Sequence, residues 1–297
     1  MSDAAETAIA AELESIAVEQ PLREAARMFL RNGVAVLGLV LLIAVLILTL
    51  VVPHFYPVDP FDLVWAPFSP PGTENAPLGT DYLGRDILAG IIHGGSATLA
   101  VGASAALITI VIGIAVGSLA GFYGGWVDDL LMRVTEFFQV LPTLLFAMVI
   151  VALFEPTIVN VAAAIGVVSW TAVARLARSE FLRIRSLDYV KAARAIGSRN
   201  NRIIWRVILP NAMPPLVVQS ALTVGIAILF EAGLSFLGLS DPNVMSWGFM
   251  VGSNRAYLLD AWWTVTIPGF CIFLTVLSVS LIGDGLNDAL NPKLRQR

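Results

Sequence analysis

Cysteine, histidine and lysine are scarce in this sequence, and each scarcity excludes a class of chemistry. A single cysteine, Cys271, excludes an intrachain disulfide. The two histidines, His54 and His93, stand apart from each other and from the cysteine, so no metal site is expected. Neither of the two lysines, Lys191 and Lys293, follows a glycine, as the lysine of a nucleotide-binding P-loop does. We therefore expect no metal, no bound cofactor and no ATP-hydrolysing activity in this chain.

Charged residues are also scarce, and long apolar runs make up much of the sequence. Only 13% of the 297 residues are charged, 57% are hydrophobic, and the mean hydropathy is +0.81. This composition is typical of an integral membrane protein. Apolar runs of bilayer-spanning length predict an all-α fold with six transmembrane helices, at residues 33–52, 98–121, 130–154, 158–174, 213–237 and 262–282.

The basic residues fix the expected orientation of these spans. Of the 18 Lys and Arg residues, all but Arg85 and Arg255 fall on one side of the six-span layout. Positive charge collects on the cytoplasmic side of membrane proteins, so both termini are expected inside the cell. The expected parts are a cytoplasmic tail (1–32), a first span (33–52), an external loop (53–96), a transmembrane domain (97–284) with a cytoplasmic loop at 176–211, and a cytoplasmic C-terminal tail (285–297).

The external loop is rich in proline and turn residues. Within it, Asp86 is expected to cap a short helix whose apolar residues share one face, so that the helix lies along the membrane surface. These apolar residues are Ile87, Leu88, Ile91 and Ile92.

The cytoplasmic loop is basic and contains a short predicted helix. Asp188 is expected to cap a helix that begins at Tyr189, and Gly197 to end it. Such a short helix is marginal in isolation, which suggests that it docks against another surface. Pro210 is expected to set the bend into the next span. A plain alternative is a solvated basic loop that only anchors the chain inside the cell.

The residue order of this loop resembles the EAA loop of permease subunits in binding-protein-dependent ABC importers. The pattern is carried by Ala192-Ala193, then Gly197, then Val-Ile-Leu-Pro at 207–210. This chain has Lys191 where the family has glutamate, so no role for that glutamate is carried over, and Val207 replaces an isoleucine. The resemblance implies that the helix couples the subunit to a partner ATPase. The coupling residues would be Tyr189, Lys191, Ala192, Ala193, Ala195, Ile196, Gly197 and Pro210.

Three further segments resemble the second, C-type permease subunit of dipeptide, oligopeptide and nickel importers. They are PLGTDYLGRDIL at 77–88, EAGLSFLGL at 231–239 and GDGLNDALNPKLR at 283–295. The resemblance implies a type I ABC importer fold in a bacterial or archaeal inner membrane. It implies a second permease subunit, two ATPases that bind ATP and Mg²⁺, and an external binding protein. Peptides are the substrates it implies first, with nickel chelates, glutathione-like peptides and short sugars left open.

Three glycines four residues apart, Gly113, Gly117 and Gly121, leave one face of the second span bare for close helix packing. That packing lies either within the subunit, which we favour, or against another subunit. Arg133 and Glu136, one turn apart in the third span, are expected to form an ion pair.

Two residues inside spans are candidates for the translocation path. Pro142 is expected to kink the third span, as proline does in helices that line a path and in ordinary membrane helices alike. Glu231 lies in the fifth span, where a carboxylate must face protein or water. Its role is either a polar point on the path or a structural hydrogen bond to a neighbouring helix, and the absence of a basic partner at similar depth favours the second.

Two rival classes stay open. An ion-gradient-driven secondary transporter usually carries a cluster of ionisable residues within the membrane, and here Glu231 is the one candidate. A non-transporting membrane scaffold would use the basic loop only to bind a partner.

Overall fold

In the computed structural model, residues 21–290 are described, and helices make up most of them. The longer helices carry the spans, and shorter ones lie at their ends. The helices are α2 (Pro21–Arg31), α3 (Gly33–Leu50), η1 (Val52–His54), α4 (Ile87–Tyr123), α5 (Gly125–Val140), α6 (Thr143–Leu153), α7 (Ile158–Ser169), α8 (Thr171–Arg185), α9 (Asp188–Ala195), α10 (Asn200–Ile203), η2 (Ile204–Ile208), α11 (Leu209–Phe236), α12 (Trp247–Asn254), η3 (Arg255–Tyr257) and α13 (Trp263–Leu290).

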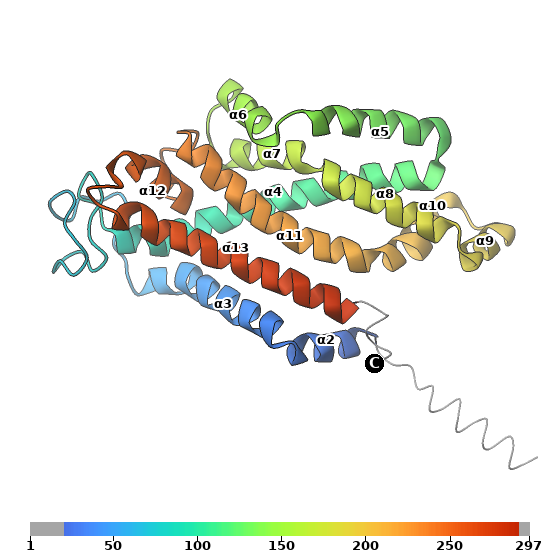
Figure 1. The fold of residues 1–297 in the computed structure, drawn as a ribbon, viewed down its shortest axis with the longest axis horizontal. Helices are drawn as coiled ribbons and strands as arrows, with labels where there is room; N and C mark the ends of the chain where they lie inside the picture. The colour runs from blue at the N-terminus through green and yellow to red at the C-terminus, as the bar shows by residue number, and fades with distance from the viewer. Residues whose placement is uncertain (1–20, 291–297) are drawn as a thin grey trace, which may run out of the picture.

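Four continuous helices are long and apolar enough to cross a membrane: α3 with η1, α4, the run from α10 through α11, and α13. Two further spans are bent pairs, α5 with α6 and α7 with α8, which brings the total to six. The all-helical, six-span fold class is thereby confirmed. Figure 1 shows the long helices side by side, with the external loop at one end of the bundle and α2, α9 and the end of α13 toward the other.

The short surface helix predicted after Asp86 does not exist as a separate element. Asp86 caps a helix, accepting the backbone N–H groups of Leu88 and Ala89, but that helix is α4, which runs on to Tyr123. Ile87, Ile91 and Ile92 are buried in the protein instead of lying on the membrane surface. The hydropathy pattern placed the start of this span too late because Gly94, Gly95 and Ser96 interrupt the apolar run without interrupting the helix.

Asp86 also holds the external loop onto α4. The Tyr56 hydroxyl donates to the Asp86 carboxylate at 2.7 Å, and the Tyr56 carbonyl lies 3.0 Å from His93 Nε2. Burial, the hydrogen bond and the negative charge of Asp86 together raise the pKa of Tyr56 to about 12. Because this folded pKa lies above the ordinary value of 10, the contribution of Tyr56 to stability is complete below pH 10 and is lost as pH rises toward 12.

We expect Asp86→Ala to lower the stability of the purified protein by about 1–2 kcal/mol, because it removes the α4 cap and the acceptor of Tyr56 together. Thermal unfolding in detergent measures the effect. Glu74→Ala is the control, since Glu74 is an exposed carboxylate of the same external loop. Equal melting temperatures for the two variants would show that the Asp86 contacts contribute nothing.

The third span is broken rather than kinked. α5 and α6 meet at 87° across Leu141 and Pro142, and Pro142 is the N-cap of α6. The break follows from the chemistry of proline, which restricts Leu141 to extended backbone and cannot continue the helix that ends at Val140.

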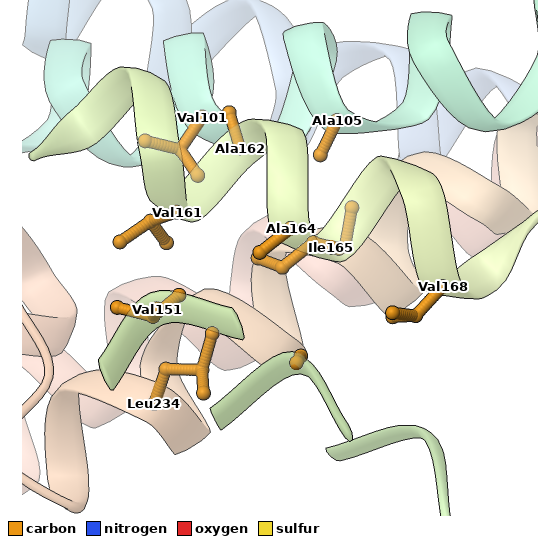
Figure 2. Close-up of a cluster of buried hydrophobic side chains, with 11 residues drawn as sticks. Val101, Ala105, Val151, Val161, Ala162, Ala164, Ile165, Val168 and Leu234 are labelled. Atoms are coloured by element: carbon orange, nitrogen blue, oxygen red, sulfur yellow. The ribbon is translucent and has the colours of Figure 1, made fainter. Parts of the chain in front are cut away.

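The apolar core near the external end joins helices that are distant in sequence. Val101 and Ala105 of α4, Val151 of α6, the inner face of α7 and Leu234 of α11 meet there, as Figure 2 shows. α6, which follows the break at Pro142, is therefore held in place by its packing against α7 and α11.

The ends of the described chain pack together at the end of the bundle away from the loop at 55–86. The Asn32 side chain caps α3 and donates to Asp288 of α13 at 3.1 Å. The predicted C-terminal tail at 285–297 is helical as far as Leu290, because α13 extends past its apolar stretch. The remainder of that tail, and residues 1–20 of the N-terminal tail, lie outside the described residues.

Candidate coupling helix and cytoplasmic groove

The predicted coupling helix is α9, a separate eight-residue helix. It begins one residue earlier than predicted, because Leu187 is the N-cap and Asp188 is the first helical residue. The Asp188 carboxylate pairs with Lys191 at 2.9 Å instead of capping the backbone. Both side chains are exposed, so this pair contributes little to stability.

Gly197 ends α9 as predicted. Its φ is +79°, and its N–H donates to the carbonyl of Arg194 at 2.9 Å. The N–H of Ser198 reaches back to the carbonyl of Ala193 at 3.1 Å. These two hydrogen bonds, together with a glycine in the left-handed conformation, form the Schellman motif. This motif fixes the direction in which the chain leaves a helix.

One face of α9 is anchored to the protein. Val190 is fully buried in a cluster that includes Phe122 of α4, Phe181 and Ile184 of α8, and Ile203. The guanidinium of Arg194, on the same face, lies 5.3 Å from the centre of the Phe122 ring. α9 is therefore packed against α4, α8 and the start of the α10–α11 helix.

The opposite face of α9 is exposed, and its apolar and small side chains lie beside the charged pair of Asp188 and Lys191. Tyr189 is 46% exposed and Ile196 is 82% exposed, and Ala192 between them is also exposed. Ala193 is partly buried at the edge of this face, and Ala195 is exposed beside it. An exposed face of apolar and small side chains on an anchored helix is suited to entering a cleft of another protein.

Pro210 does not bend the chain as predicted, and it is not part of the exposed α9 face. It lies at the start of α11, directly after a π-helical turn at Ile204–Ile208 in which the N–H of Leu209 bonds to the carbonyl of Ile204. The π turn rearranges the hydrogen bonds just before a residue that has no N–H to donate. The helix from Asn200 to Phe236 consequently runs on without a sharp bend.

Glu231 lies at the contact between α11 and α12 and is only 3% exposed. Its Oε1 accepts the hydroxyls of Ser246 at 2.8 Å and Ser235 at 3.0 Å. A Cβ on Gly248 would come within 2.8 Å of the carboxylate, so glycine makes room for it. Ser246 is the N-cap of α12, which puts the carboxylate near the positive end of that helix.

We expect Glu231→Gln to assemble normally, because its amide oxygen can accept both hydroxyls. Glu231→Leu removes an acceptor from two buried hydroxyls and should cost about 1–3 kcal/mol. Melting temperature and uptake are to be measured for both variants. Loss of uptake by the Gln variant at an unchanged melting temperature would contradict this structural role and assign Glu231 to the path.

The three spaced glycines of α4 face α8 within the same subunit. A Cβ on Gly113 would lie 2.6 Å from the Cβ of Val173, and one on Gly121 would lie 2.7 Å from the Cβ of Phe181. At Gly117, a Cβ would overlap the backbone carbonyl of Ala174. α8 packs directly on this glycine face of α4, because the missing side chains let the two backbones approach closely.

A polar groove lies between α5 and α8, and sequence reasoning missed it. Its volume is about 1180 Å³. It is lined by Asp128, Asp129, Met132, Arg133, Thr135, Glu136, Gln139, Ala172, Arg175, Leu176, Arg178 and Ser179. The available signal was the presence of Arg133, Glu136 and Gln139 inside an otherwise apolar span.

The predicted ion pair between Arg133 and Glu136 does not form, since the part of the chain that the structure describes holds no such contact within 4.0 Å. The ion pair of the groove is instead Arg178 with Asp128, whose two contacts measure 2.5 and 2.6 Å. Of the two residues predicted for the path, Pro142 lies just beyond the groove's inner end, three residues after Gln139. Glu231 lines a different, small pocket with Ser240 and Asp241.

The chain matches two family models. Residues 113–296 match the binding-protein-dependent transport system inner membrane component, and residues 20–77 match the N-terminal transmembrane domain of oligopeptide transport permease C. The di/tripeptide transport system permease protein of Pseudomonas aeruginosa is 40% identical over 95% of both chains. The dipeptide transport system permease protein of Haemophilus influenzae is 36% identical over 95% of this chain and 98% of its own.

A solved structure shares the fold. It is the methionine ABC transporter MetNI in an inward-facing conformation, which aligns with a TM-score of 0.57 at 19% identity, covering 67% of this chain and 94% of that one. With six helical spans, an anchored cytoplasmic helix and these matches, the chain belongs to the binding-protein-dependent ABC importer family, as a multi-pass permease of the inner membrane.

Proposed function

We propose that this permease carries short peptides inward and is driven through α9 by separate ATPases. The geometry of α9 is the observation that carries the coupling: one face is locked into the protein by Val190, and the other presents Tyr189, Ala192 and Ile196 outward. The other residues proposed for this role are Lys191, Ala193 and Ala195, which belong to α9, and Gly197, which ends it. Two ATPases would bind ATP and Mg²⁺, and each permease subunit would dock one of them.

The proposed substrate class rests on the relatives. Their names specify di/tripeptide, dipeptide and glutathione transport, at 36–40% identity over most of this chain. All of these are short peptides that carry both an amino group and carboxylates. Nickel chelates and short sugars have no comparable support among these relatives.

The proposed pore has two permease subunits, this one and a similar but non-identical partner. The exposed apolar stripes of α5 and α6 leave surface for such a partner as well as for lipid. An external binding protein would deliver the peptide at the end of the molecule that carries residues 53–86. Closure of the ATPases would then move α9 and open the path on alternating sides.

The test is uptake of labelled L-alanyl-L-alanine by cells that lack this chain and by the same cells with it restored. Uptake should return with the chain, stop when ATP is depleted, and persist with an uncoupler. Uptake that stops with the uncoupler while ATP remains high would indicate an ion-gradient-driven transporter. Equal dipeptide uptake with and without the chain would contradict the peptide assignment.

A further inference from the structure

Helix α5, which forms one wall of the α5–α8 groove, is amphipathic. Around α5, one stripe of exposed residues is apolar, and an adjacent stripe that faces the groove is polar. The apolar stripe is Trp126, Leu130, Val134, Phe137 and Val140, and the polar stripe is Asp129, Arg133, Glu136 and Gln139. Lipid or a partner helix suits the first stripe, whereas charged side chains in a span must face protein or water.

Contacts at both ends keep the two helices of the groove in place. At the cytoplasmic end, the ion pair between Arg178 and Asp128 joins α8 to α5. At the inner end, the Phe138 and Trp170 rings lie 5.4 Å apart, and Arg175 donates to Gln139 at 2.8 Å. Small and polar residues between these contacts leave the groove open, and its volume exceeds the roughly 300–1,000 Å³ of ordinary small-molecule sites.

Apart from the ion pair of Arg178 with Asp128, charges of both signs line this groove without pairing with each other. Arg133 and Glu136 are exposed, and among the described residues neither makes a hydrogen bond or an ion pair. Arg175 contributes a second guanidinium, which is held only by a neutral amide. A ligand that carries a carboxylate and an ammonium group could contact both kinds of side chain at once.

We propose that this groove is the cytoplasmic half of the translocation path and a weak binding site for zwitterionic peptides, with Arg133 and Arg175 facing the peptide carboxylate and Glu136 facing its ammonium group. The proposal rests on the proposed function. The mixed charges favour a zwitterion over a free anion or cation, because each of those would meet repulsion from part of the lining. Exposure to water keeps such contacts weak, as release into the cytoplasm requires.

The first test measures protection from the cytoplasmic side, where the binding protein plays no part. In a Cys271→Ser background, Gln139→Cys is labelled with a charged thiosulfonate in inside-out vesicles of the full complex without nucleotide. L-Alanyl-L-alanine should slow labelling, and its N-acetylated, C-amidated analogue should not. Ser186→Cys, at the exposed end of α8 outside the groove, is the control and should not respond to either compound. Equal labelling of Gln139→Cys with and without the dipeptide would overturn the proposal.

The second test removes one unpaired charge of each sign, so that the net charge does not change. Arg133→Gln with Glu136→Gln should lower dipeptide transport per ATP hydrolysed by about tenfold, as expected when charge-assisted hydrogen bonds are lost. The matched control is Arg183→Gln with Glu180→Gln, which removes one cation and one anion from the ion pair of α8 that lies outside the groove. Equal dipeptide transport per ATP hydrolysed in the two double variants would overturn the proposal.

The outcomes separate this inference from the proposed function. If the unaltered complex imports dipeptides but neither test responds, the groove assignment is wrong and the peptide assignment stands. If the unaltered complex imports no dipeptide, the peptide assignment fails on its own. If the neutralised variant does not assemble, the labelling result alone decides the groove assignment.

Discussion

Gly117→Leu should abolish assembly of this permease. The site has no room for any side chain, since even a Cβ would overlap the carbonyl oxygen of Ala174 and lie 2.7 Å from the Cβ of Ala177. Both neighbours belong to α8, and one of them is backbone, so no rotamer change relieves the clash. Overpacking of a well-packed core costs about 1–3 kcal/mol, and more when backbones must separate.

The expected result is a strong loss of folded complex in the membrane, measured by size-exclusion chromatography after mild detergent extraction. Gly269→Leu makes the same change in α13, another spanning helix, at a position where a Cβ would have no neighbour within 4 Å. That control should assemble normally. Normal yield and normal transport from Gly117→Leu would show that α4 and α8 do not pack as described.

Gly197→Val should leave the subunit folded and inserted but unable to couple. A Cβ at this position would meet nothing within 4 Å, so the obstacle is the backbone, which has a φ of +79°. A β-branched residue in this conformation costs roughly 1–2 kcal/mol or more, and relief requires the Schellman turn to open. The chain would then leave α9 in another direction and shift the exposed face of Tyr189 and Ile196.

The measurement for Gly197→Val is ligand-stimulated ATP hydrolysis in proteoliposomes, together with retention of the ATPase on the purified complex. A cost of this size corresponds to a loss of roughly 5–30-fold. Gly197→Asn is the control, because asparagine tolerates the left-handed conformation, and it should retain most of the activity. Equal, full stimulation in both variants would mean that the exit from α9 plays no part in coupling.

Much of this architecture could be predicted from the sequence because two strong physical signals act along it. Apolar runs of bilayer length predicted the six spans, and the distribution of Lys and Arg predicts an orientation, with both termini in the cytoplasm. The end of α9 at Gly197 was predictable as well, since few residues other than glycine accept the left-handed conformation that the Schellman turn requires.

The features that sequence reasoning missed are those that hydropathy does not report. α4 begins at Ile87 and α13 continues to Leu290, because helices extend past the apolar stretch that marks a span. The 87° break at Pro142 exceeds an ordinary proline kink, and what holds α6 at that angle is tertiary packing on α7 and α11. The groove was missed because its two walls, α5 and α8, are separated in sequence by α6 and α7.

The most direct measurement of the central claim is photo-crosslinking from the exposed face of α9. A benzoylphenylalanine at Ile196, which is 82% exposed, is irradiated in membranes that contain the whole transporter. A second one at Trp205, also exposed but outside α9, serves as the control. We predict a covalent product between this subunit and the ATPase from position 196 and none from position 205. A transporter that co-purifies with its ATPase but gives no such product from position 196 would contradict the assignment of α9 as the coupling helix.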